Sequence, residues 1–314
     1  MTTAPAPQQI RAPGFSHLVT VQSPCAAWSE SKAREACRQL ELGDIIFFPQ
    51  SPIDIPPQDR DLLLGRKQSS SAYHKNIAYR PAEDRVTGLD ASEQAEAAKL
   101  RRILRNYSQA SVEFLSYFLQ PYAGKWKLDF ASFRPVEEQG RQARVHARND
   151  LLHFDSFPTR PTNGARILRF FTNINPAQNR VWLTSQTFES FGSHFARKTG
   201  KLHSFRNPVS RGLHAVGRAL HLPGAYRPPY DELMHRCHNA MKEDSNFQET
   251  APRHRWEFPP NSSWMVCTDC VSHAVLSGQY ALEQTLLIPQ SALVEPQRSP
   301  LAILENLAAT HLTL

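Results

Sequence analysis

One triplet in the sequence combines two residue types that bind metal ions. His153 and Asp155, in the segment LLHFDSFPTRP, form the only His-x-Asp triplet among the thirteen histidines of the chain. Side chains two apart on a strand project from the same face, so an imidazole and a carboxylate can reach one ion, while Phe154 points into the sheet. The triplet alone is weak evidence, because such pairs also arise by chance and a metal site needs a third ligand.

His273 is the best candidate for the third ligand. It follows a predicted strand in the segment WMVCTDCVSHAVLSGQ and precedes Gly278. Two histidines and one carboxylate on one face of a ferrous ion leave positions open for a co-substrate and for oxygen. A hydrogen-bonded histidine at the end of a strand is the alternative interpretation.

A second group of residues has the types that are found in zinc sites. Cys267-x-x-Cys270 supplies two thiols, and His235-x-x-His238 places two imidazoles on neighbouring turns of a predicted helix. However, cysteines three apart on a strand point to opposite faces, and the chain has no second Cys-x-x-Cys pair. We therefore prefer the His-x-Asp site to a structural zinc centre. No helix follows CTDC, which also weakens a thioredoxin-like role.

The elements that must position these residues change in type along the chain. Residues 29–40 predict a short helix, residues 44–49 a buried strand, and residues 91–119 a long amphipathic helix. After Tyr122, short apolar runs alternate with turn residues, which is typical of a β-sandwich or jelly roll. These runs are 126–130, 144–157, 165–174, 180–183, 263–271 and 282–288.

We therefore predict an α+β fold with a double-stranded β-helix, or jelly-roll, core. Residues 1–122 would form an N-terminal, helix-rich support packed on the core. Residues 123–314 would form the jelly roll that carries the candidate site, with a basic helical insertion at about residues 190–255.

The insertion contains charge of one sign. Between residues 190 and 230 there is no Asp or Glu, whereas seven Lys or Arg and four His occur. Two stripes at helical spacing predict a short basic amphipathic helix. One stripe is apolar (Val209, Leu213, Val216 and Leu220) and the other is basic (Arg211, His214, Arg218 and His221). Docking on an anionic membrane surface is one interpretation, and packing on its own domain is the other.

Composition narrows the class of protein further. The chain of 314 residues has a net charge of +7, which favours anionic partners. Its five cysteines do not form a disulfide framework, and its start lacks an apolar signal segment, so we expect a cytoplasmic protein. The insertion has few aromatic residues on which bases could stack, so nucleic acid is not the expected partner.

Two long segments resemble the Kdo hydroxylase family. They are HFDSFPTRPTNGARILRFFTNINP and FPPNSSWMVCTDCVSHAVLSGQYALEQT, and the shorter pieces ELGDIIFFP and HKNIAYRP are similar too. The likeness covers most of the chain and is thin across the basic insertion. Members of this family are iron and 2-oxoglutarate dependent dioxygenases that hydroxylate carbon 3 of the outer Kdo sugar on lipid A precursors. The resemblance therefore implies Fe(II), 2-oxoglutarate and O2, with ascorbate as the reductant.

The resemblance also implies roles for individual residues. The iron ligands would be His153, Asp155 and His273. The basic and aromatic positions around the cavity correspond to Arg134, Arg169, Arg180 and Trp182. Many related dioxygenases bind 2-oxoglutarate with a basic residue about ten positions after the distal histidine, but residues 277–288 contain none.

Another arginine must then bind the co-substrate. On an extended strand Arg169, Phe171 and Asn173 share a face, and Arg166 points the other way. We assign 2-oxoglutarate binding to Arg169, Asn173 and Thr285, and sugar binding to Arg134, Arg180 and Trp182. The sequence leaves open whether Arg169 binds the co-substrate or the sugar.

The resulting hypothesis is a Kdo 3-hydroxylase, peripheral on the cytosolic face of the inner membrane, that acts on a Kdo-bearing lipid A precursor. Two alternatives stay open. One is a 2-oxoglutarate oxygenase with another acidic substrate. The other is a non-enzymatic basic protein that binds anionic membrane or nucleic acid. The oligomeric state is also left open.

Overall fold

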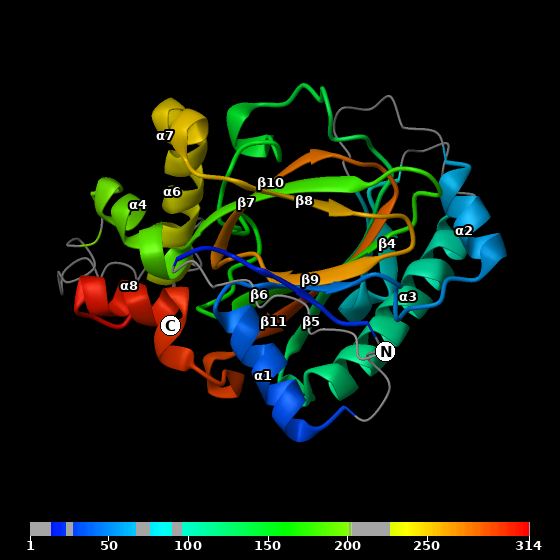
Figure 1. Ribbon diagram of the computed structural model, residues 1–314, viewed down its shortest axis with the longest axis horizontal. Coiled ribbons are helices and arrows are strands. Elements are labelled where there is room, and N and C mark those ends of the chain that lie inside the picture. Colours follow the sequence, from blue (N-terminus) through cyan, green and yellow to red (C-terminus); the bar gives the residue numbers. More distant parts are fainter. Residues whose placement is uncertain are drawn as a thin grey trace, which may run out of the picture.

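Two β-sheets face each other in the computed structural model of this chain, which describes residues 14–22, 28–66, 76–89, 96–200, 202 and 227–313. Helices lie on the outer side of the larger sheet and at one end of the sheet pair, as Figure 1 shows. This arrangement of two antiparallel sheets with flanking helices agrees with the predicted α+β jelly roll.

Eight strands form the larger sheet, and all neighbours are antiparallel except β1 and β2. In spatial order the strands are β1 (Leu18–Thr20), β2 (Ile45–Phe48), β9 (Ser263–Cys267), β6 (Arg166–Asn173), β11 (Ala281–Ile288), β5 (Lys127–Arg134), β3 (Ile77–Arg80) and β4 (Arg85–Thr87). The first four strands of the chain thus extend both edges of this sheet. The division at residue 122 stays a prediction, but strands on both sides of it share one sheet.

Three strands form the smaller sheet, in the order β10 (Val271–Ser277), β7 (Arg180–Thr187) and β8 (His254–Phe258). Strand β9 belongs to the larger sheet and β10 to the smaller one, so the turn at residues 268–270 carries the chain from one sheet to the other. The apolar run 263–271, predicted as one strand, is therefore two strands joined by a corner.

The helices follow their apolar periodicity. They are α1 (Glu30–Glu41), α2 (Pro57–Leu64), α3 (Ala97–Phe118), α4 (Ser193–Lys198), α6 (Pro229–Glu243), α7 (Ser245–Thr250) and α8 (Pro300–Ala308). Helix α1 begins after Ser29, whose hydroxyl accepts a hydrogen bond from the Lys32 amide, as an N-cap does. The basic face of α3 is held by carboxylates, because Arg102 pairs with Asp59. None of the helices within the described ranges has the length and apolar character that a bilayer span requires.

The apolar core has two parts, one on each face of the larger sheet. Leu168 and Phe170 of β6 belong to the main cluster, where Phe170 packs against Phe114 of α3. Phe171 points the other way and packs against Trp182 and Trp264 in the space between the sheets. Because β6 is buried on both faces, the residues at its inner face can form a site that excludes water.

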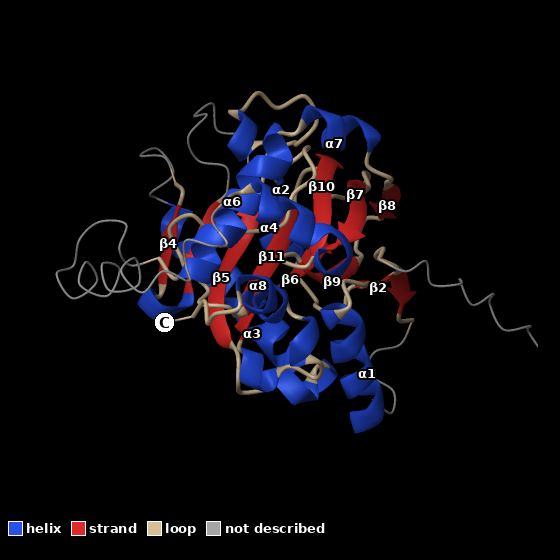
Figure 2. Cartoon of the chain, turned by 90° about the vertical axis from the view of Figure 1, so that its left-hand side faces the viewer, coloured by secondary structure: helices blue, strands red, loops and turns tan. Residues whose placement is uncertain are grey.

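One predicted element lies outside the residues that the structure describes, and another differs from what the structure shows. The stripes at residues 209–221 that predict a basic helix fall outside the described residues. The run 144–157, predicted as a strand, contains a 3-10 turn at Val145–Ala147 and one isolated bridge at His153. Helices α4, α6, α7 and α8 gather at one end of the sandwich, which Figure 2 views from that side, and α6 contacts the turn at Val145–Ala147.

Candidate metal centre

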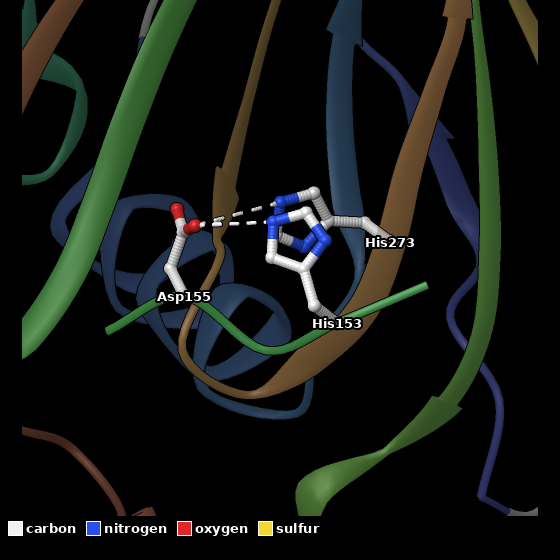
Figure 3. A group of neighbouring side chains, drawn as sticks. All are labelled: His153, Asp155 and His273. Carbon is white, nitrogen blue, oxygen red and sulfur yellow. Dashed lines mark ion pairs between the residues drawn. The ribbon is translucent and has the colours of Figure 1, made fainter. Parts of the chain in front are cut away.

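Three predicted ligands converge at one point between the sheets. The Nε2 atom of His153 lies 3.5 Å from Oδ1 of Asp155, and Nε2 of His273 lies 4.0 Å from the same oxygen. Figure 3 shows the carboxylate facing both imidazole rings. One ligand atom from each residue lies within 4.8 Å of the others, and this is the only such group of three or more among the residues that the structure describes. The predicted convergence is confirmed.

The backbone places the ligands with little freedom. His153 and His273 exchange two main-chain hydrogen bonds, N to O at 3.1 and 3.0 Å, across an isolated antiparallel bridge. The Asp155 amide donates to the carbonyl of Thr268, in the corner between the sheets, at 2.9 Å. The His-x-Asp segment is therefore held by β10 and by the corner, although it belongs to no regular strand.

Each imidazole is held in the tautomer that a metal ion needs. Nδ1 of His153 donates to the carbonyl of Leu151 at 2.7 Å, and Nδ1 of His273 donates to that of Val271 at 3.0 Å. A carbonyl can only accept, so both protons are on Nδ1 and both Nε2 lone pairs face Asp155. Trp182 stacks on the His273 ring at 5.4 Å.

The charge states also suit a divalent ion. Burial lowers the pKa of His153 well below its ordinary value and lowers that of His273, so both rings are neutral near pH 7. Burial opposes ionisation of Asp155, but the Arg169 guanidinium outweighs it and holds the carboxyl pKa well below its usual range. Two neutral imidazoles and a carboxylate with open space beside them fit a ferrous ion.

The cavity beside these ligands is lined by three arginines, Arg134, Arg169 and Arg180. Phe171 and Trp182 form part of its apolar wall. A larger surface groove, of about 720 Å³, runs along residues 289–313, but it contains no comparable cluster of ligating side chains among the described residues. The chemistry therefore belongs to the smaller cavity.

Two of the arginines share one buried carboxylate. Arg134 donates through Nε to Oε2 of Glu283 at 2.7 Å, and Arg169 donates to the other oxygen of the same group. Nη2 of Arg169 also lies 2.9 Å from Oδ2 of Asp155. Burial opposes ionisation of Glu283, but Arg134 and Arg169 lower its pKa to about 2. Arg169 thus points inward, as its position on the strand predicts.

Sequence reasoning missed Glu283. It occupies the tenth position after His273, where many related dioxygenases have a basic residue, and here the charge is reversed. The sequence could have identified Glu283, because it lies two residues before Thr285 on the predicted strand and so projects from the same face as that predicted site residue. Asn149 and Val275 line the cavity as well and were also missed.

Two residues assigned to the co-substrate do not line the cavity. The Asn173 amide donates to the carbonyls of Gln178 and Phe258, both at 2.9 Å. Thr285 donates to Oε1 of Glu283 at 2.9 Å. Their assignment to 2-oxoglutarate stays a prediction, and Thr285 reaches the cavity only through Glu283.

The rival zinc centre does not form among the described residues. Cys267 ends β9 and Cys270 lies in the corner, where its thiol contacts the Cys267 carbonyl at 3.3 Å. The expectation that both lie on one strand was wrong, because the chain turns between them. His238 instead donates through Nδ1 to the carbonyl of Phe154 at 2.8 Å, and its ring packs against that of His153.

Comparisons with known proteins agree with this geometry. The family model of 3-deoxy-D-manno-oct-2-ulosonic acid (Kdo) hydroxylase matches residues 25–311. The crystal structure of the Kdo hydroxylase KdoO, a non-heme Fe(II) alphaketoglutarate dependent dioxygenase, in complex with alphaketoglutarate and Fe(III) is 29% identical, with a TM-score of 0.81 over 94% of this chain and 97% of that chain.

Two further structures of KdoO, one apo and one in complex with cobalt(II), are each 30% identical over the same shares, also with TM-scores of 0.81. No curated protein matches the chain. The family match spans nearly the whole chain and includes the strands, the corner and the His-x-Asp segment described above. This chain therefore belongs to the Kdo hydroxylase family of non-heme Fe(II), 2-oxoglutarate dependent dioxygenases.

Proposed function

We propose that the protein hydroxylates carbon 3 of a Kdo sugar carried on a lipid A precursor, with the reaction centred on His153, Asp155 and His273. The observation that carries this proposal is the convergence of the two Nε2 atoms on one carboxylate inside an arginine-lined cavity. Membership of the Kdo hydroxylase family supports the choice of sugar.

The three ligands would hold Fe(II) on one face. Iron bound there together with 2-oxoglutarate and O2 supplies the oxidising chemistry: 2-oxoglutarate is converted to succinate and CO2, with one oxygen atom entering succinate and the other entering a substrate C–H bond. The chain's own side chains then have to position the reactants and exclude water. No acid or base residue is required of the protein, and ascorbate would keep the iron reduced between turnovers.

Arg169 is the residue we assign to 2-oxoglutarate. It contacts Asp155, so its guanidinium lies beside the metal ligands, and its buried Nε has no hydrogen-bond partner among the described residues. A guanidinium matches a carboxylate in shape and charge. Thr285 would contribute indirectly, because it holds the Glu283 carboxylate that holds Arg169. No contact of Asn173 supports its predicted role in binding 2-oxoglutarate, because its side-chain amide is bonded to backbone carbonyls.

Arg134, Arg180 and Trp182 are the residues we assign to the sugar. All three line the cavity. Their side chains combine charged donors with an aromatic wall, which suits an acidic sugar. The basic segment at residues 190–230 would bring the protein to the anionic inner-membrane surface, where the lipid-anchored substrate is found.

Mass spectrometry tests this function directly. Incubation of Kdo-lipid A with the protein, Fe(II), ascorbate and 2-oxoglutarate should add one oxygen atom to the sugar. His153→Ala and Asp155→Ala should abolish the product while the circular dichroism spectrum stays unchanged. An unmodified lipid with the wild-type protein, or full turnover by either variant, would refute the proposal.

A second candidate is oxidation of another acidic substrate by the same centre. The donor-rich cavity is its only support, since that cavity suits other carboxylates as well as Kdo. Conversion of 2-oxoglutarate to succinate that is stimulated by a different sugar acid, and not by Kdo-lipid A, would favour it.

A further inference from the structure

The His-x-Asp segment is supported on two sides. Strand β10 supports one side, because His153 and His273 exchange both of their main-chain hydrogen bonds. In a paired strand the backbone groups of alternate residues point to opposite edges. The polar backbone groups of Leu152 and Phe154 therefore point away from β10 and need partners elsewhere.

Gln248 of α7 is the partner of Leu152. The Leu152 amide donates to Oε1 of Gln248 at 2.9 Å, and Nε2 of Gln248 donates to the Leu152 carbonyl at 2.9 Å. Two residues on paired strands exchange hydrogen bonds in the same pattern. The carboxamide of Gln248 thus occupies the place of a peptide group on a neighbouring strand.

His238 of α6 is the partner of Phe154. Its Nδ1 donates to the Phe154 carbonyl at 2.8 Å, and Phe154 is the residue between the ligands His153 and Asp155. The His238 ring also packs edge to face on the His153 ring, with 4.8 Å between the ring centres. The second histidine of the His-x-x-His motif therefore supports the segment that carries two of the metal ligands.

Helices α6 and α7 act as one unit. Nε2 of Gln248 also donates at 2.9 Å to the carbonyl of Met241, in the last turn of α6, where carbonyls have no partner within the helix. Asp244, between the two helices, caps α7 through its carboxylate. Nζ of Lys242 donates to the carbonyl of His146 at 3.0 Å and fastens α6 to the chain before the ligand segment.

The sheet itself does not require these helices. They lie between β7 and β8, which are neighbouring antiparallel strands of the smaller sheet, and such strands can be joined by a two-residue turn. The chain instead leaves the sheet there and builds α6 and α7 at the end of the sandwich (Figure 1). Their hydrogen bonds to the ligand segment indicate what they add.

The hydrogen bonds of this unit bear directly on the ligands. Leu152 is buried, with 1% of its surface exposed, and buried backbone groups must be paired. Without Gln248 the Leu152 backbone would have to move toward other partners or admit water. His153 is the next residue, and the residues of such a site must be held to within about 0.5 Å.

We propose that α6 and α7 take the place of a neighbouring strand beside the His-x-Asp segment, and that Gln248 and His238 are positioning residues that set the affinity and coordination geometry of the metal ion. This inference rests on the metal centre of the proposed function and not on the choice of sugar. It gives the second half of the helical insertion a role at the reaction centre.

Titration with Co(II) in the presence of 2-oxoglutarate and without O2 tests the proposal. Calorimetry measures the affinity, and the visible absorption spectrum of bound Co(II) reports the coordination geometry. Gln248→Met keeps the length of the side chain and loses its hydrogen bonds. It should weaken Co(II) binding roughly 10-fold, the lower end of the range for outer-shell partners, and should shift the spectrum. His238→Leu should change both in the same direction.

Two further variants make the test specific. Asn places a side-chain nitrogen near the position of Nδ1 of His, so His238→Asn keeps the donor to Phe154 and should bind Co(II) within about threefold of the wild type. The control is Asn246→Met, which removes an exposed carboxamide from the same helix as Gln248. Its affinity and spectrum should be those of the wild type.

The outcomes separate this proposal from a purely structural role. If Gln248→Met and His238→Leu bind Co(II) as the wild type does, with an unchanged spectrum, the proposal is overturned even where the melting temperature falls. If His238→Asn binds as weakly as His238→Leu, His238 is overturned as a positioning residue that acts through Phe154.

A wild-type protein that does not bind Co(II) would instead contradict the proposed function. Circular dichroism shows whether each variant is folded. Because Gln248 and His238 lie on different helices, either variant carries the test if the other does not fold.

Discussion

The two faces of strand β6 use the same residue type for different purposes. Arg166 points to the outer face, is fully buried and pairs with Asp269 at 2.8 Å. Arg169, three residues later, points to the inner face and contacts Asp155 and Glu283 beside the metal ligands. On the outer face, the Arg166–Asp269 pair holds the corner that follows β9 against the sheet. On the inner face, the ion pairs of Arg169 border the open cavity.

The comparison separates stability from function within one strand. Asp269 also accepts a hydrogen bond from the Ile167 amide, so the outer pair ties the corner to the sheet. The inner carboxylates remain next to space that ligands can enter. Changes on the outer face should therefore weaken the fold, and changes on the inner face should weaken ligand binding.

The largest effect is expected at the metal ligand on the inner side. Asp155→Ala should weaken Co(II) binding by more than about 100-fold, because loss of an outer-shell partner alone costs about 10- to 100-fold. The free energy of unfolding should change little, since Arg169 keeps Glu283 as a partner. Calorimetry and urea unfolding measure the two quantities. If Asp155→Ala still bound Co(II) tightly, the claim that the inner face of β6 serves ligand binding would be contradicted.

The next effect is expected on the outer face. Asp269→Ala leaves Arg166 buried without its carboxylate and should lower the free energy of unfolding by about 3–5 kcal/mol. The matched double variant, Arg166→Met with Asp269→Leu, should recover most of this loss because it removes both charges. Urea unfolding checks both values. A single variant as stable as the wild type would show that the outer pair does not fasten the corner.

The smallest effect concerns the pH dependence of stability, through Glu283. Its pKa in the folded protein is about 2, against an ordinary value of 4.5. The resulting stabilisation is fully present above about pH 4.5 and is lost as the pH falls toward 2, and it amounts to roughly 3 kcal/mol.

Glu283→Gln lacks this titration. The difference in unfolding free energy between the wild type and this variant should therefore be nearly constant from pH 6 to about pH 4.5 and should shrink from there to pH 3, as followed by urea unfolding at each pH. A difference that stays constant down to pH 3 would mean that Arg134 and Arg169 do not stabilise the ionised form of Glu283.

Much of this arrangement is encoded locally. The two-residue period of a strand predicts that Arg169 faces inward and Arg166 outward, and both are confirmed. The residue types of the His-x-Asp triplet and His273 predict a metal site, and the three do converge. These features depend only on side-chain chemistry and on the geometry of a single strand.

Other features depend on contacts that no local pattern contains. Glu283 functions through Arg134 of β5 and Arg169 of β6, which become its neighbours only when three strands pair. The corner at residues 268–270 could not be predicted from the sequence either, because CTDC continues an apolar run and contains no glycine or proline to indicate a turn. Its turn is fixed by the Arg166–Asp269 pair and by the backbone bond from Asp155.

The two main-chain hydrogen bonds between His153 and His273 have a kinetic consequence. They join segments that are far apart in the polypeptide through the backbone alone, so the pairing of the strands meets the loop-closure entropy of bringing the two imidazoles together. Capture of an ion then requires little further ordering. We therefore expect the protein to exchange one bound metal ion for another without global unfolding.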